Sequence, residues 1–83
     1  MNIYIGNLNY KIEENELKEV FSEFGTVDSV KIIYDKHSNR SKGFGFIEMP
    51  NDDEGNKAIE NLNGKELSGR TMVVNVARKK VED

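Results

Sequence analysis

The fold is decided by one stretch of eight residues, Lys42-Gly43-Phe44-Gly45-Phe46-Ile47-Glu48-Met49. Side chains alternate across a β-strand, so this stretch places Ile47 and Met49 on one face. Phe44, Phe46 and Glu48 lie on the other face. Because the aliphatic face suits a hydrophobic core, we predict a strand in a sheet that has one covered face and one open face, with aromatic rings on the open side.

The start of the chain repeats this arrangement over 2–5. Ile3 and Ile5 are predicted to face the core and Tyr4 the open side, because successive residues point to opposite faces. The opposite parity would bury the rings and expose the aliphatic residues, which loses buried apolar area. With the predicted parity, three of the seven Tyr and Phe side chains lie on a wet surface, as is typical of a binding site.

Two helices and two further strands complete the pattern. Apolar residues recur with helical spacing after Ile12, and acidic residues occupy the first turn of that segment. Gly25 follows it, where a left-handed C-cap is expected. After the first strand, the expected elements are a helix over 13–24, strands over 27–34 and 43–49, a helix from a cap at Asn51 or Asp52 to Gly64, a turn-rich connection over 65–69 and a strand over 71–77.

This order of elements, β-α-β-β-α-β, predicts an α+β fold of the ferredoxin-like type. In that fold a four-stranded antiparallel sheet carries two helices on one face. The opposite face stays open to solvent and is where we expect function to lie. We predict a single domain over residues 1–80, followed by a short charged tail at 81–83.

Composition excludes several classes of function. A chain of 83 residues is too short for a large enzyme barrel, which needs about 250. It has no cysteine, hence no disulfide and no thiol nucleophile, and its single histidine, His37, cannot build a histidine-rich metal site. No segment has the about 20 apolar residues that cross a bilayer, and no signal region opens the chain. We therefore expect an intracellular, cytoplasmic protein with no membrane, metal or cofactor requirement.

Two stretches resemble the signature motifs of the RNA recognition motif family. The octamer matches the pattern K/R-G-F/Y-G/A-F-V-x-F/Y in its first five positions, and Ile47 replaces valine. Met49 departs from the final aromatic, at a position that faces the core. The second motif of the family is similar to Ile3-Tyr4-Ile5-Gly6-Asn7-Leu8, with an aromatic in second place. The resemblance covers residues 2–80 and implies a non-enzymatic, monomeric binder of single-stranded RNA.

The resemblance also implies roles for individual residues. Tyr4 and Phe44 would each stack a base, Phe46 would lie against a ribose, and Lys42 would pair with a phosphate. Gly43 and Gly45 are expected to leave the Phe44 ring uncrowded. Stacking tolerates any base and does not read the 2′-hydroxyl, so single-stranded DNA is a second candidate ligand. Further expected RNA contacts are Asn2, Lys31, Ile33, Arg40, Glu48, Asn75, Ala77, Arg78 and Lys79.

One local feature departs from the family pattern. Members of the family often begin the first helix with a Thr or Asp cap, where this chain has Ile12. An isoleucine side chain cannot accept a hydrogen bond from the first turn, which is expected to cost about 1 kcal/mol.

The net charge of −3 argues against nucleic acid until its distribution is considered. Residues 13–23 carry −4 and residues 52–60 carry −3, so the rest of the chain carries +4. The acidic charge is therefore predicted on the helices and the basic charge near the open face. The run Arg78-Lys79-Lys80 suits either a solubilising tail or phosphate contact.

Two other functions compete with RNA binding. Exposed aromatic residues also serve protein interfaces, so a protein-interaction module on the same sheet face is the alternative hypothesis. A small ferredoxin-like enzyme such as an acyl phosphate hydrolase would need an anion-binding loop with catalytic Arg and Asn residues. The sequence shows no such loop, and its carboxylates do not converge with a nucleophile.

Overall fold

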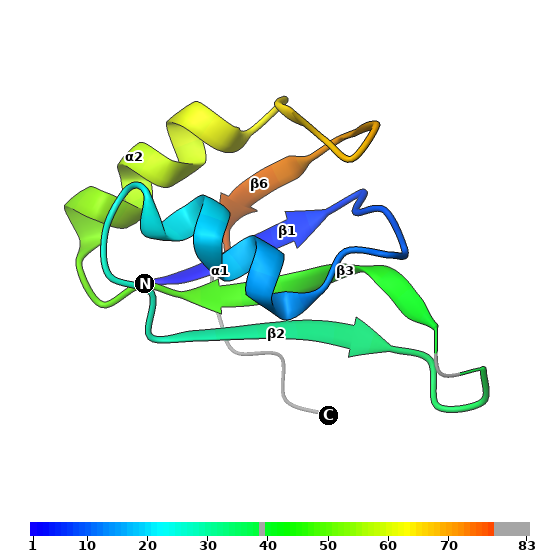
Figure 1. The fold of residues 1–83 in the computed structure, drawn as a ribbon. Helices are drawn as coiled ribbons and strands as arrows, with labels where there is room; N and C mark the ends of the chain where they lie inside the picture. Colours follow the sequence, from blue (N-terminus) through cyan, green and yellow to red (C-terminus); the bar gives the residue numbers. More distant parts are fainter. Residues whose placement is uncertain (39, 78–83) are drawn as a thin grey trace.

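The computed structural model describes residues 1–38 and 40–77. It shows a four-stranded antiparallel sheet with both helices on one face (Figure 1). The element order confirms the predicted α+β, ferredoxin-like architecture. The elements are β1 (Asn2–Gly6), α1 (Glu14–Ser22), β2 (Ser29–Tyr34), β3 (Ser41–Glu48), α2 (Asp52–Leu62), β4 (Glu66–Leu67), β5 (Arg70–Thr71) and β6 (Val73–Val76).

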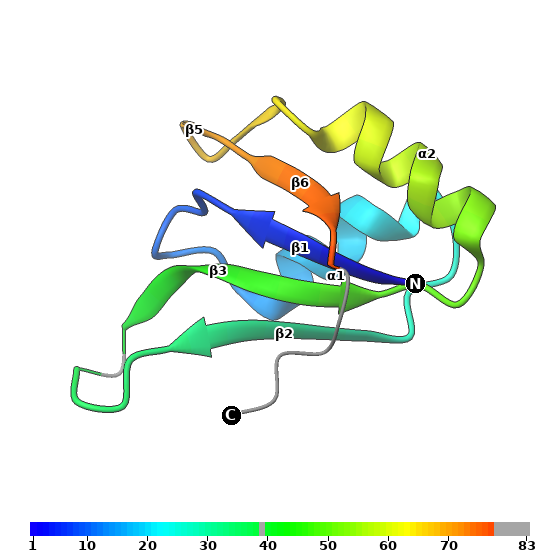
Figure 2. The ribbon, with the colours of Figure 1, turned by 180° about the vertical axis from the view of Figure 1, so that it is seen from behind.

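The strands of the main sheet lie in the order β2-β3-β1-β6, so β3 and β1 are central. In the register of these two strands, Tyr4 lies opposite Phe46. The neighbouring strands place Lys31 opposite Phe46 and Asn75 opposite Tyr4. Figure 2 shows the sheet from the side that no helix of the described residues covers.

The hydrophobic core lies between the sheet and the helices. Ile3, Ile5, Ile47 and Met49 are buried, as the predicted strand parity requires. The amphipathic face of α1 adds Leu17 and Phe21 to the same cluster, and α2 adds Ala58 and Leu62. Full burial of such a side chain stabilises the fold by about 1.5–3 kcal/mol. The remaining members of the core are Leu8, Ile12, Ile32, Met72 and Val74.

The start of α1 differs from the prediction. The N-cap residue is Glu13, whose backbone N–H donates to the side chain of Glu16 at 3.3 Å. Ile12 lies one residue earlier and is buried in the core. The expectation that Ile12 occupies the cap position was therefore wrong, and so was the stability cost assigned to it.

The end of α1 also differs from the prediction. Gly25 has a φ of 159°, which is not the left-handed conformation expected of a C-cap. A β-carbon at Gly25 would instead collide with the side chain of Glu54. The Oε1 atom of Glu54 accepts a hydrogen bond from the N–H of Thr26 at 3.1 Å. Glycine is thus required here because α2 approaches the α1–β2 connection closely.

A second carboxylate joins α1 to the sheet. The register of β2 against β3 shifts between Ile32 and Tyr34. The N–H of Ile32 donates to Oε2 of Glu14, at the start of α1, at 3.0 Å. This contact satisfies a partly buried backbone donor beside the irregularity, where an unpaired donor would be costly.

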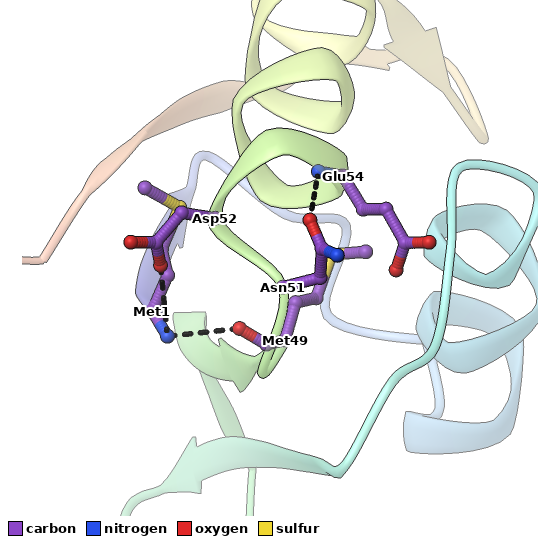
Figure 3. A network of polar contacts seen from close by, with 5 residues as sticks. All are labelled: Met1, Met49, Asn51, Asp52 and Glu54. Atoms are coloured by element: carbon purple, nitrogen blue, oxygen red, sulfur yellow. Dashed lines mark hydrogen bonds and ion pairs between the residues drawn. The ribbon is translucent and has the colours of Figure 1, made fainter.

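The start of α2 confirms one of the two expected caps. Asn51 accepts a hydrogen bond from the N–H of Glu54 through Oδ1 at 3.0 Å (Figure 3). The amino group of Met1 donates to the carbonyl of Met49 at 2.8 Å and lies 3.8 Å from Oδ1 of Asp52. These contacts hold the start of β1 against the connection between β3 and α2.

The segment before the last strand was only partly predicted. Residues 65–69 were expected to form a turn-rich connection, and in the structure Glu66–Leu67 pairs with Arg70–Thr71 as a separate two-stranded hairpin. Ser68 and Gly69 form its turn with φ values of 51° and 83°. The last strand of the main sheet is therefore Val73–Val76, shorter than the expected 71–77.

Candidate binding surface on the open face of the sheet

Three aromatic rings gather on the open face, and we call them the three-ring cluster: Tyr4, Phe44 and Phe46. Their centroids lie 6.1 Å apart for Tyr4 and Phe44, 5.9 Å for Tyr4 and Phe46, and 6.3 Å for Phe44 and Phe46. The corresponding angles between ring planes are 33°, 62° and 89°. Each ring is half-buried, so the cluster forms a continuous apolar surface that is still open to a ligand.

The sequence places these rings through strand parity and register. Tyr4 stands between the buried Ile3 and Ile5 in β1, and Phe46 precedes the buried Ile47 in β3. Because the two strands pair at Tyr4 and Phe46, the rings meet on the face that the helices do not cover. Edge-on contacts between such rings contribute about 0.5–1.5 kcal/mol beyond their buried area.

The structural reason for the two glycines beside Phe44 differs from the predicted one. Gly43 and Gly45 are buried, since neighbours in a strand point to opposite faces. A β-carbon on Gly45 would collide with the backbone carbonyl of Lys31. Gly43 has a φ of 82°, which residues other than glycine rarely adopt. Both glycines are required by the backbone of the sheet, so the expectation that they make room for the Phe44 ring was wrong.

Basic side chains border the cluster. Lys31 lies opposite Phe46 on β2, and Lys42 precedes Phe44 on β3. Both are exposed, and so is Arg40 before the start of β3. Within residues 1–38 and 40–77, no carboxylate lies within ion-pair distance of these three cations.

The other positions predicted on this face lie either on β1 and β3 or on and just after β6. Asn2 and Glu48 are cross-strand partners at one end of β1 and β3, and both are half-buried. Asn75 lies opposite Tyr4 on β6 and is exposed. The N–H of Ala77 donates to the carbonyl of Asn2 at 2.9 Å, which continues the β1–β6 pairing past the end of β6. These four residues therefore border the three-ring cluster along β1, β3 and the end of β6.

The last of the predicted positions have a weaker structural basis. Ile33 is half-buried and lies within the register shift of β2, beside Ile32 and Tyr34. Arg78 and Lys79 lie outside the described residues. The fold thus brings together the positions predicted on β1, β3 and β6, and places Lys31 beside them.

A groove next to the cluster was not predicted from the sequence. It has a volume of about 510 Å³, and Phe44 is among the residues that line it. Tyr10 supplies a further ring to it and is 62% exposed. The only signal in the sequence was a tyrosine in a polar turn, which is too common to single out. The groove is lined by Tyr10, Asp35, Ser38, Arg40, Ser41, Lys42 and Phe44.

Other classes of site find no support among the described residues. No group of three His, Asp or Glu side chains gathers in residues 1–38 and 40–77 where it could hold a metal ion. No helix in the described part of the chain is long and apolar enough to cross a membrane.

The family follows from the motifs, the fold and a direct comparison of sequences. Residues 3–73 match the profile of the family described as RNA recognition motif. The chain belongs to the RNA recognition motif family, a family of binding domains and not of enzymes.

Similar proteins come from plants and cyanobacteria. The chain is 45% identical over 78 residues to the chloroplastic 28 kDa ribonucleoprotein of Nicotiana sylvestris. That match covers 94% of this chain and 28% of the Nicotiana protein. It is 46% identical over 78 residues to a protein of Nostoc sp. named "Putative RNA-binding protein RbpB". That match covers 94% of this chain and 76% of the Nostoc protein. The chain spans about a quarter of the length of the chloroplastic relatives it matches.

Solved structures agree with the fold. The crystal structure of the RNA-binding protein PG1 has a TM-score of 0.94 and 41% identity, with 99% of each chain covered. The RNA recognition motif of Rna15 with bound RNA has a TM-score of 0.84 and 29% identity, covering 94% of this chain and 83% of that one.

Proposed function

We propose that this chain binds single-stranded RNA on the open face of the sheet, at the three-ring cluster. The observation that carries the proposal is the group of half-buried Tyr4, Phe44 and Phe46 rings within about 6 Å of one another. Each aromatic–base stack contributes about 1–3 kcal/mol, and stacking of this kind suits unpaired bases. The names of the relatives and the bound RNA in the Rna15 structure support the choice of RNA.

The roles of the three rings form the finer part of the proposal. Tyr4 and Phe44 each stack a base, and Phe46 contacts a ribose. The planes of Tyr4 and Phe44 differ by 33°, so these two rings present similarly directed faces to neighbouring bases. Phe46 stands at 62° and 89° to them, an orientation that suits a sugar more than a parallel base.

The exposed cations around the cluster contact the phosphates. Lys42 and Arg40 lie beside Phe44 along the groove, and Lys31 lies beside Phe46. The acidic residues of α1 and α2 are on the covered side, so the open face is the more basic one despite the net charge of −3. RNA approaching the sheet is therefore attracted locally while the helix side repels it.

The remaining positions complete the proposed site. Asn2, Glu48 and Asn75 offer hydrogen bonds to base edges around the rings, and Ile33 and Ala77 offer apolar or backbone contact. Arg78 and Lys79 are retained on their charge alone. We also propose that residues 1–80 act as one monomeric unit and that single-stranded DNA competes with RNA. The expected cytoplasmic location stays a prediction, and the plant relatives are named as chloroplastic.

Chemical-shift mapping with a short single-stranded RNA tests the location of the site. We expect the largest shifts at Tyr4, Phe46 and Asn75, and small shifts at Ala58 and Leu62 on the helix side. The competing function, a protein-interaction module, uses the same face but not a phosphate backbone. Binding of RNA that is insensitive to salt, or shifts confined to the helices, would contradict the proposal.

A further inference from the structure

We propose that the groove beside the three-ring cluster is an additional nucleotide subsite that selects guanine. The inference rests on the proposed function, since it extends the RNA site beyond Phe44. Three observations carry it: an exposed ring at Tyr10, a nucleotide-sized space, and one carboxylate, Asp35, among cations.

The Tyr10 ring lies beside Gly43 of β3. The N–H of Leu8 donates to the carbonyl of Gly43 at 2.8 Å, which ties the connection after β1 to the start of β3. The Cε1 atom of Tyr10 lies 3.4 Å from the position that a β-carbon on Gly43 would occupy. The ring thus packs over a residue without a side chain while it remains 62% exposed. A tyrosine side chain has only two χ angles, so it loses little conformational freedom when a base stacks on it.

The groove has a suitable size and position for one nucleotide. Its volume of about 510 Å³ lies within the about 300–1,000 Å³ usual for sites that take small ligands. Phe44 lines the groove and also belongs to the three-ring cluster. A strand whose base stacks on Phe44 can therefore place its next nucleotide in the groove without crossing open solvent.

The polar side chains of the groove suit different parts of a nucleotide. Arg40 and Lys42 are donors only and match the phosphate. Asp35 is an acceptor and would repel a phosphate, so within an RNA site it is favourable where it accepts hydrogen bonds from a base edge or a ribose hydroxyl. We propose the base edge, since only that contact makes affinity depend on the base. If Asp35 only stabilised the loop between β2 and β3, the affinity for RNA would not depend on which base lies in the groove.

The carboxylate of Asp35 is oriented by its neighbours. Its Oδ1 accepts from the N–H of His37 at 2.8 Å, and its own N–H donates to the carbonyl of Arg40 at 2.7 Å. A carboxylate has about four acceptor positions, so most of them are left for a ligand. This local network keeps Asp35 at the groove instead of letting it rotate freely into solvent.

Guanine is the base whose edge matches a carboxylate. Its Watson–Crick edge carries two adjacent N–H donors, which pair with both oxygens of a carboxylate. Adenine and cytosine present one amino group beside an acceptor, and uracil presents one N–H between two carbonyls. Unpaired bases are read on these edges, and charge-assisted bonds are the stronger ones.

The test uses the full chain and oligouridylates in which a single guanosine is moved along the strand. Fluorescence anisotropy is expected to show one position at which guanosine raises affinity about fivefold over uridine. Inosine at that position lacks the amino group and is expected to lose most of the gain. This comparison changes only the RNA, so it is independent of any effect on folding.

Protein variants then assign the contact. Asp35→Asn is expected to abolish the preference for guanosine, while the matched Asp28→Asn, at the other end of β2, retains it. Tyr10→Ala is expected to weaken binding about fivefold, and Tyr34→Ala, an exposed tyrosine outside the groove, is expected to have little effect. Thermal unfolding of each variant checks that the fold is retained.

Three results separate the possible failures. Equal affinity for guanosine and uridine at every position, or a preference that survives Asp35→Asn, would overturn guanine selection. Unchanged affinity in Tyr10→Ala would overturn the subsite while leaving the three-ring cluster intact. Absence of binding by the unmodified chain to every oligonucleotide would instead contradict the proposed function itself.

Discussion

Tyr4 lies directly opposite Phe46 across the two central strands, with ring centroids 5.9 Å apart and planes at 62°. This pairing anchors the candidate site, because it joins the motif at the start of the chain to the motif in β3. Phe44 closes the triangle from two residues earlier in β3. An aromatic surface built from two distant segments exists only when the sheet is formed, so the proposed binding requires the folded sheet.

The role assigned to Phe46 gives the first prediction. Because we propose that this ring contacts a ribose, Phe46→Ala should weaken RNA binding by less than Phe44→Ala does. The measurement is the affinity of both variants for the same oligonucleotide, by anisotropy. A loss at Phe46 as large as the loss at Phe44 would contradict the ribose contact and indicate that Phe46 also stacks a base.

The second prediction concerns the salt dependence of binding. Each phosphate contact on a single strand contributes about −0.7 to the slope of log K against log salt concentration. Lys42→Gln should therefore reduce the magnitude of this slope by about 0.7. Lys57→Gln on α2 removes the same charge from the covered side and should leave the slope unchanged. Equal slopes for the Lys42 variant and the unmodified chain would show that Lys42 contacts no phosphate.

Gly45 gives the third prediction, which concerns stability. A β-carbon there would collide with the backbone carbonyl of Lys31. Gly45→Ala should therefore lower the free energy of unfolding by about 1–3 kcal/mol, as overpacking usually does. The control is Gly64→Asn, since no atom lies within 4 Å of a β-carbon there and asparagine enters a positive φ, here 84°, at a smaller cost than most residues. If denaturant unfolding finds the two variants equally stable, the close approach of β2 is not what requires glycine.

The fourth prediction concerns the cap of α2. Asn51→Ala removes the acceptor for the N–H of Glu54 and should lower the free energy of unfolding by about 1 kcal/mol. Asn56→Ala makes the same change inside the exposed part of α2 and should be neutral or slightly stabilising. The comparison by thermal or urea unfolding is contradicted if the Asn56 variant is the less stable of the two.

Much of the fold and of the site was predictable because strand parity has a short period. The alternation of Ile3, Tyr4 and Ile5, together with that of 44–49, was enough to place the rings and the core on opposite faces. Helix faces followed from apolar spacing in the same way. These features depend on neighbours in the sequence, and the structure confirms them.

The features that were missed depend on contacts between distant segments. The groove at Tyr10 forms where the connection after β1 meets β3 at the bond between Leu8 and Gly43, which no local pattern predicts. The requirement for glycine at Gly25 comes from Glu54 on α2. The β4–β5 hairpin has two residues in each strand, too few to show an alternation.

The most direct test of the central claim is the RNA affinity of Phe44→Ala. The half-exposed ring can be removed without opening the core, so thermal unfolding should show a folded variant. We predict that its binding free energy for single-stranded RNA is weaker by about 1–3 kcal/mol, the contribution of one stacked base. A folded Phe44→Ala protein that binds RNA as tightly as the unmodified chain would contradict stacking on the open face.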